Sequence, residues 1–69
     1  MNTQSILSKN IRRIIDEKGL KQKAIAQECR INEKAFSNML CNRQEIRTHN
    51  LPLIAKALDV DISELFKTD

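Results

Sequence analysis

The chain has 69 residues, and a chain of this length forms one small domain that buries only about 60% of the surface its unfolded state exposes. With one glycine, one proline and two aromatic residues among many Ile, Leu, Ala, Lys, Glu and Gln residues, the composition favours helices. We therefore expect a single all-α domain over residues 1–69, with its core in residues 5–67.

The charge is positive and unevenly distributed. Residues 1–56 hold 11 Lys and Arg against 5 Asp and Glu, whereas residues 57–69 hold one basic residue against four acidic ones. A basic body with an acidic end suits a polyanionic partner. One histidine, no glycine-rich loop and no paired carboxylates near a nucleophile leave nothing to assemble a catalytic site, so we expect no enzyme.

The two cysteines give no sign of a metal site or a disulfide framework. Cys29 and Cys41 lie twelve positions apart, and the chain has a single histidine, His49. We expect Cys29 to be a small core residue and Cys41 a half-buried thiol, with no metal and no cofactor. No apolar run is long enough to span a membrane, and the N-terminus lacks the apolar region of a signal peptide. We therefore expect a cytoplasmic protein with no membrane partner.

The first predicted helix begins at Ser5, as its cap, and runs to about Lys18. Gly19 then ends it, because glycine just past the last periodic residue is a common C-terminal signal. Apolar residues recur at spacings of three and four and so share one face of this helix: Leu7, Ile11, Ile14 and Ile15.

Two shorter helices follow, over residues 21–29 and 33–41. Asn32 is expected to cap the second of them through its side-chain oxygen. The two helices are expected to pack together through one set of apolar residues: Ile25, Ala26, Cys29, Ile31 and Phe36. Met39 and Leu40 also point inward, which leaves the polar face at the start of the second helix free to contact something else.

Residues 43–49 show no period and are expected to form a loop. Asn50 caps a fourth helix, with Pro52 in its first turn, where a missing N–H has no cost. Asp61 and Glu64 form a capping box for a last short helix over residues 62–67. The apolar residues of these two helices are Leu51, Ile54, Ala55 and Leu58, then Ile62, Leu65 and Phe66.

Two short helices joined by a turn of three or four residues fit a helix-turn-helix. In that arrangement the first helix crosses the DNA backbone and the second enters the major groove. The sequence also resembles the phage repressor and Cro type of helix-turn-helix domain, the XRE family, from about Lys9 to Phe66. The segments that carry the resemblance are IRRIIDEKGLKQKAIAQ, INEKAFSNM and LIAKALDVDISELF.

The resemblance implies a compact five-helix, lambda-repressor-like fold with the helix-turn-helix at helices two and three. It also implies a small transcriptional regulator, a repressor, that binds double-stranded DNA sequence-specifically with a recognition helix at about 33–41. By position, the residues implied to face base edges are Glu33, Lys34, Ala35 and Asn38. Those implied to contact phosphates are Lys21, Gln22, Ser37, Arg43 and Arg47. Gln22 is also implied to brace the recognition helix.

These residues have simpler interpretations as well. Glu33 complements the N-terminal dipole of its helix. Its carboxylate would be repelled by nearby phosphates unless it accepts a hydrogen bond from a cytosine N4 amino group. Lys34 and Asn38 can belong to an ordinary solvated surface. The alternative function is therefore a protein-interaction module that keeps the helix-turn-helix fold without specific DNA binding, since a fold alone does not fix function.

Three positions depart from the pattern of the family. Arg30 stands where the family usually has glycine in the turn, and a left-handed conformation there costs about 1–2 kcal/mol. Ile15 and Leu40 replace a base and a glutamate that often pair, so we expect these two apolar residues to meet in the core. Asn42 replaces another glycine, and asparagine tolerates the left-handed conformation.

A domain this small contacts few bases, so we expect a homodimer on a near-palindromic operator with half-sites about 10 bp apart. The expected dimer contact lies in the C-terminal region, from the loop before the fourth helix onward. Val60, Leu65 and Phe66 are candidates for this contact. The other possibility is that they close the domain's own core, as apolar residues of a short last helix usually do.

Overall fold

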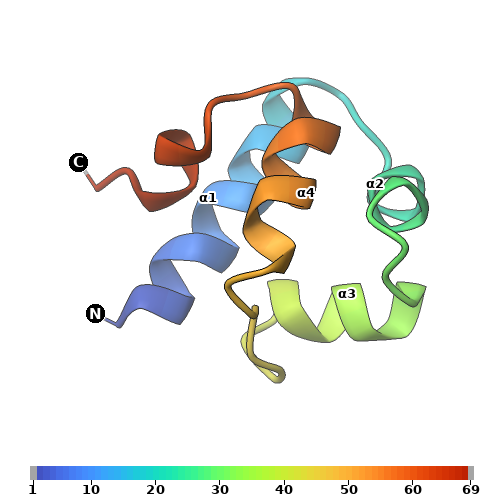
Figure 1. The fold of residues 1–69 in the computed structure, drawn as a ribbon, viewed down its shortest axis with the longest axis horizontal. Helices are drawn as coiled ribbons and strands as arrows, with labels where there is room; N and C mark the ends of the chain where they lie inside the picture. The colour runs from blue at the N-terminus through green and yellow to red at the C-terminus, as the bar shows by residue number, and fades with distance from the viewer. Residues whose placement is uncertain (1, 69) are drawn as a thin grey trace.

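A computed structural model describes residues 2–68 and shows an all-α fold, as the composition predicts (Figure 1). Its elements in chain order are α1 (Thr3–Glu17), α2 (Gln22–Glu28), α3 (Glu33–Leu40), α4 (Asn50–Leu58) and η1 (Ile62–Phe66). No strand is present between residues 2 and 68. The prediction of five α-helices is not confirmed, because the last element is a single 3₁₀-helix, η1, that covers 62–66.

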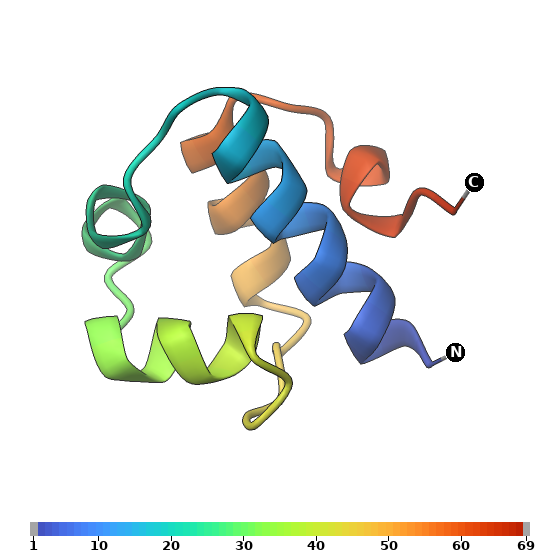
Figure 2. The same cartoon turned by 180° about the vertical axis from the view of Figure 1, so that it is seen from behind.

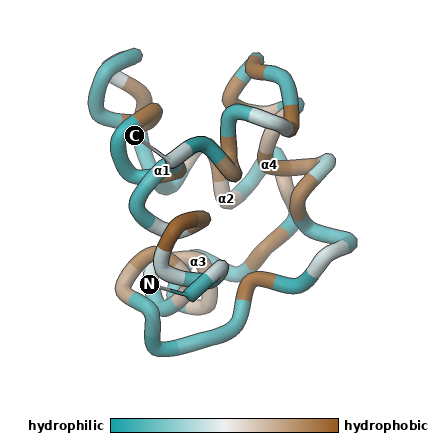
Figure 3. The backbone as a smooth tube through the Cα atoms, turned by 90° about the vertical axis from the view of Figure 1, so that its left-hand side faces the viewer, coloured by the Kyte–Doolittle hydropathy of each residue, from teal (hydrophilic) through white to brown (hydrophobic). Residues whose placement is uncertain are grey.

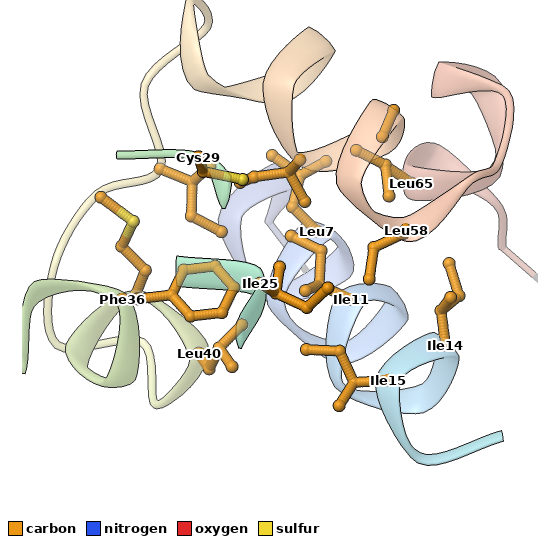
Figure 4. Close-up of a cluster of buried hydrophobic side chains, with 14 of the residues drawn as sticks. Leu7, Ile11, Ile14, Ile15, Ile25, Cys29, Phe36, Leu40, Leu58 and Leu65 are labelled. Atoms are coloured by element: carbon orange, nitrogen blue, oxygen red, sulfur yellow. The ribbon is translucent and has the colours of Figure 1, made fainter. Parts of the chain in front are cut away.

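The buried core draws side chains from all five elements, and the predicted apolar faces of α1, α3 and α4 all turn inward. Phe36 reaches from α3 into the centre of the cluster, toward Ile25 of α2 (Figure 4). Along the chain, hydrophobic and hydrophilic residues alternate as expected for helices with one buried face (Figure 3). Ala24 is exposed, so only Ala26 of the alanines in α2 packs closely.

Each helix packs against at least two other elements around this core. α3 packs against α1 and α2, α2 also contacts α4, and η1 rests on both α1 and α4. In the two opposite views of Figures 1 and 2, α3 and the loop that follows it form one edge of the molecule, with η1 away from that edge. The recognition-helix candidate therefore lies at the periphery.

The N-terminal caps differ in two places from the sequence prediction. Ser5 does not begin α1: Asn2 does, and its side-chain oxygen accepts a hydrogen bond from the Ser5 amide at 2.8 Å. Asn50 is the first residue of α4 and is buried, whereas the flanking His49 makes no side-chain cap. The predicted cap at Asn32 is confirmed, with hydrogen bonds from the amides of residues 34 and 35. The N-terminal caps thus shift by three positions in α1 and by one in α4.

Each of the four α-helices is followed, one or two positions after its last residue, by a residue with left-handed backbone: Gly19, Arg30, Asn42 and Asp59. In each case the next amide reaches back across the last turn, for example Leu20 to Ile15 O at 2.9 Å and Val60 to Ala55 O at 3.0 Å. This pattern is the Schellman motif. Each helix is thus terminated by backbone geometry that gives the chain a sharp change of direction.

The C-terminal element is held by polar side chains of α1. The buried amide of Asn10 donates to Leu65 O at 2.8 Å and to Lys67 O at 2.9 Å, and Lys18 donates to Leu58 O at the end of α4. Of the three apolar residues of this element, only Leu65 is buried. Ile62 and Phe66 are 39% and 44% exposed.

Asp61 caps η1, as predicted, through a hydrogen bond from the amide of Ser63. The hydroxyl of Ser63 also donates to the same carboxylate, and these two hydrogen bonds hold the pKa of Asp61 below its usual value. The side chain of Glu64 makes no reciprocal bond to Asp61 within the described residues, because it pairs with Lys67 instead. The capping box is therefore only half formed.

Candidate nucleic-acid interface

α2 and α3 are joined by a tight turn that sets the angle between them. Arg30 has φ 57°, its amide donates to Gln27 O at 3.1 Å, and the Ile31 amide donates to Ala26 O at 2.9 Å. The turn therefore uses the left-handed conformation for which the family has glycine, with an arginine in its place. The chain keeps the geometry and carries the steric strain of a Cβ at that position.

The turn delivers the polar start of α3 to the surface. The side-chain oxygen of Asn32 accepts from the Lys34 amide at 2.9 Å and from the Ala35 amide at 3.3 Å, which fixes the first turn of the helix. Phe36, Met39 and Leu40 are buried, so the opposite side of α3 faces outward. Glu33 and Lys34 are exposed there. Ala35, Ser37 and Asn38 are half-buried.

Cations flank this outward side. Lys21 precedes α2, and Arg43 and Arg47 lie in the loop after α3; all three are exposed. Neither these three cations nor Lys34 forms an ion pair with a carboxylate among residues 2–68. Their charge is not neutralised inside the domain and is available to an anionic partner.

Gln22 is exposed at the first position of α2, as its implied role with a phosphate requires. Within the described residues its side chain makes no hydrogen bond to α3. Gln22 instead lines a shallow cleft of about 350 Å³ together with residues of α1 and α3. The implied bracing of the recognition helix by this glutamine is therefore not present in the isolated domain.

The same cleft contains the two apolar residues that replace a paired base and glutamate. Ile15 and Leu40 both line it, and both belong to the buried core cluster. Leu40 is only 3% exposed. Apolar side chains thus occupy the place between α1 and α3 where the resemblance implies a charged pair, so no charge has to be desolvated there.

The cysteines take different environments. Cys29 is buried, and burial, followed by the charge of Glu28, raises the pKa of its thiol. Cys41 is exposed, so the prediction of a half-buried thiol was wrong; as the residue just after α3 it turns away from the core. Residues 2–68 contain no cluster of three His, Cys, Asp or Glu that would hold a metal ion, and no helix among them is long and apolar enough to cross a membrane.

The loop after α3 contains structure that the sequence analysis missed. Ile46 is 2% exposed and is part of the core, and both of its backbone groups are hydrogen-bonded by the side chain of Gln4. The available signal was weak: Ile46 is the single apolar residue in the stretch RQEIRTH. A lone apolar residue shows no period, so the pattern rules for helices and strands do not detect it.

Comparison of the sequence and the fold with known proteins also identifies a helix-turn-helix domain. Residues 10–69 match the model of the Cro/C1-type HTH DNA-binding domain. The sequence matches no curated protein at a significant level. Among solved structures, the fold is similar to that of the clp gene regulator ClgR from C. glutamicum, with a TM-score of 0.87 at 18% identity over 94% of this chain and 84% of that one.

Two other similar structures share more of the sequence. The restriction-modification controller protein C.Esp1396I is 27% identical, with a TM-score of 0.85 over 96% of this chain and 87% of that one. The hypothetical transcription factor NHTF from Neisseria is 26% identical, with a TM-score of 0.86 over 96% and 76%. The all-helical fold is thus one that this chain shares with regulators over nearly its full length.

Proposed function

We propose that this chain, which belongs to the family of Cro/C1-type HTH DNA-binding domains, is a small transcriptional regulator that binds duplex DNA sequence-specifically through α3. The observation that carries the proposal is the outward side of α3, where polar side chains stand between cations that have no carboxylate partner in residues 2–68. The similarity to a hypothetical transcription factor and to a restriction-modification controller protein, each above 25% identity, supports the same function.

In this proposal the first turns of α3 read base edges in the major groove. Lys34 donates to guanine, Asn38 pairs with adenine, and the Ala35 methyl meets a thymine methyl. Glu33 reads cytosine N4, or serves only to stabilise the start of α3, where the helix dipole favours an acid. Each well-formed pair contributes about 1–3 kcal/mol of discrimination between bases.

The flanking residues fix the position of the domain on the DNA backbone. Lys21, Arg43 and Arg47 contact phosphates through their charge, and the exposed Gln22 and the half-buried Ser37 contact them through hydrogen bonds. A dimer with three such cations in each subunit would release about six counterions. Its affinity would then fall about a thousandfold between 50 and 200 mM salt.

A symmetric dimer on a near-palindromic site is the arrangement that suits so small a reading surface. Of the three residues expected at the dimer contact, Leu65 is fully buried in the domain's own core and is withdrawn. Val60 is partly buried against the core, whereas Phe66 stays a candidate because it is 44% exposed, and Ile62, 39% exposed, joins it on η1. We propose that the protein acts as a repressor by occupying its operator.

The test is binding of the purified chain to a random-sequence duplex pool at 50 and 200 mM salt, followed by sequencing of the bound DNA. We expect a steep loss of binding with salt and an enriched two-fold symmetric motif. Lys34→Ala and Asn38→Ala should each relax the motif at one position, whereas Lys67→Ala, at the exposed end of η1, should leave it unchanged. Absence of salt-dependent binding would instead support a protein-interaction module.

A further inference from the structure

A side chain in the first turn of α1 forms hydrogen bonds with the loop that follows α3. The side-chain amide of Gln4 donates from Nε2 to Ile46 O at 3.1 Å and accepts at Oε1 from the Ile46 amide at 2.6 Å. A primary amide carries the same donor and acceptor as a peptide group. Gln4 therefore satisfies both backbone groups of Ile46, as a neighbouring strand would, across 42 positions of sequence.

A second set of hydrogen bonds holds the beginning of the same loop. The Asn42 amide donates from Nδ2 to Ser5 Oγ at 3.1 Å, and Ser8 Oγ lies 3.1 Å from Asn42 Oδ1. Ser8 is almost completely buried and also lies 3.2 Å from Ser5 O, so its single proton serves one of these two acceptors at a time. Asn42 is thus fixed by α1 at the point where α3 ends.

The residues held in this way directly precede two of the cations proposed to contact phosphate. Arg43 follows Asn42 directly, Arg47 follows Ile46 directly, and both side chains are exposed. Gln4 lines two shallow clefts, one with residues 42–45 and the other with residues 45–49. It therefore sits at the middle of the loop, under the stretch that carries both arginines.

Irregular backbone that must be ordered on binding loses conformational entropy, and this loss weakens the affinity. Hydrogen bonds that fix the loop before DNA arrives remove part of that cost. Ile46 is also anchored by burial of its side chain, but burial sets only where the loop rests on the core. The bonds from α1 set the direction of the backbone on either side of it.

We infer that Gln4, Ser5 and Ser8 are positioning residues for DNA binding: without contacting DNA, they hold residues 42–46 so that Arg43 and Arg47 face the phosphate backbone. The inference rests on the proposed function. It assigns a role in phosphate recognition to the N-terminal turns of α1, which lie outside the helix-turn-helix.

The experiment uses the full chain and a duplex carrying its selected motif. Gln4→Met keeps the length of the side chain but removes both bonds to Ile46, and we expect about tenfold weaker DNA binding, which is about 1.4 kcal/mol. Gln4→Glu keeps the acceptor for the Ile46 amide, but it turns a second oxygen toward Ile46 O and adds a negative charge near the phosphates, so it should weaken binding as well. Gln44→Met is the matched control, because Gln44 is an exposed glutamine of the same loop whose side chain makes no hydrogen bond within the described residues.

Combining Gln4→Met with Arg47→Ala separates positioning from general loss of stability. If Gln4 acts by placing Arg47, its removal should cost less than twofold once Arg47 is absent. Asn42→Gly provides a second test, because glycine relieves backbone strain at φ 63° while deleting the bonds to Ser5 and Ser8. This variant should bind DNA more weakly without a lower melting temperature.

The outcomes are distinct. Unchanged DNA affinity of Gln4→Met and of Asn42→Gly, or an equal loss for Gln4→Met with and without Arg47, would overturn the inference while wild-type binding upholds the proposed function. A wild-type chain that shows no salt-dependent DNA binding would overturn the proposed function, and this inference with it.

Discussion

Arg30 offers the sharpest test of how this sequence builds its helix-turn-helix. The residue has φ 57°, a conformation that costs a side chain with a Cβ about 1–2 kcal/mol relative to glycine. Against this, glycine gives the unfolded chain more conformational freedom, which lowers the stability of the folded domain by about 0.4–1 kcal/mol. The Arg30 side chain is exposed and makes no hydrogen bond within residues 2–68, so little else is lost. Arg30→Gly should therefore stabilise the domain by about 0.8 kcal/mol.

For a 69-residue domain the entropy of unfolding is about 0.14 kcal/mol/K, so this gain should raise the melting temperature by about 5 °C. Thermal unfolding followed by circular dichroism measures it. Arg30→Ala is the control for charge and side-chain loss, because alanine keeps the Cβ. Gly19→Ala is the reciprocal control: it has φ 64° and nothing within 4 Å of the new Cβ, so only backbone strain is added and the melting temperature should fall. A melting temperature for Arg30→Gly no higher than that of Arg30→Ala would refute the reasoning.

Three further results are expected. Asn32→Ala should destabilise the domain by about 0.5–2 kcal/mol in urea unfolding, since two amides of α3 lose their acceptor; an unchanged midpoint would mean that this cap is unimportant. Asn10→Ala should cost about 1–3 kcal/mol, because the carbonyls of Leu65 and Lys67 lose their donor, and protection of η1 amides in hydrogen exchange should drop with it. At neutral pH a thiol reagent should modify Cys41 quickly and Cys29 only on unfolding, because burial shields the Cys29 sulfur from the reagent and also raises the pKa of its thiol; two equally fast thiols would contradict the packing of α2.

The helices and their buried faces could be predicted from the sequence because each face repeats every three or four residues. Leu7, Ile11 and Ile14 illustrate this: local spacing decides which side of α1 is apolar, and the apolar side must be buried. The cap at Asn32 and the stop at Gly19 follow equally local chemistry. The candidate base-reading residues depend on position within the family pattern, and their roles in DNA binding stay predictions.

The prediction of helix boundaries was wrong where two nearby residues can both serve as the N-terminal cap. Ser5 and Asn2 can both cap α1; Asn2 does so, and the Ser5 hydroxyl instead accepts a hydrogen bond from Asn42. Asn50 has the chemistry of a cap, yet it is buried within α4. Phe66 is apolar and follows a helical spacing, but η1 is too short to bury more than Leu65.

The sequence by itself thus determined the class of fold, the helix-turn-helix and the inward side of each helix, because these depend on residues within one or two turns of each other. Only the tertiary structure decided how the loop after α3 is held. Gln4 meets Ile46, and Ser8 meets Asn42, across more than thirty residues of intervening chain. Such pairs have no periodic signature, since their partners become neighbours only after α1 and α3 have packed on a common core.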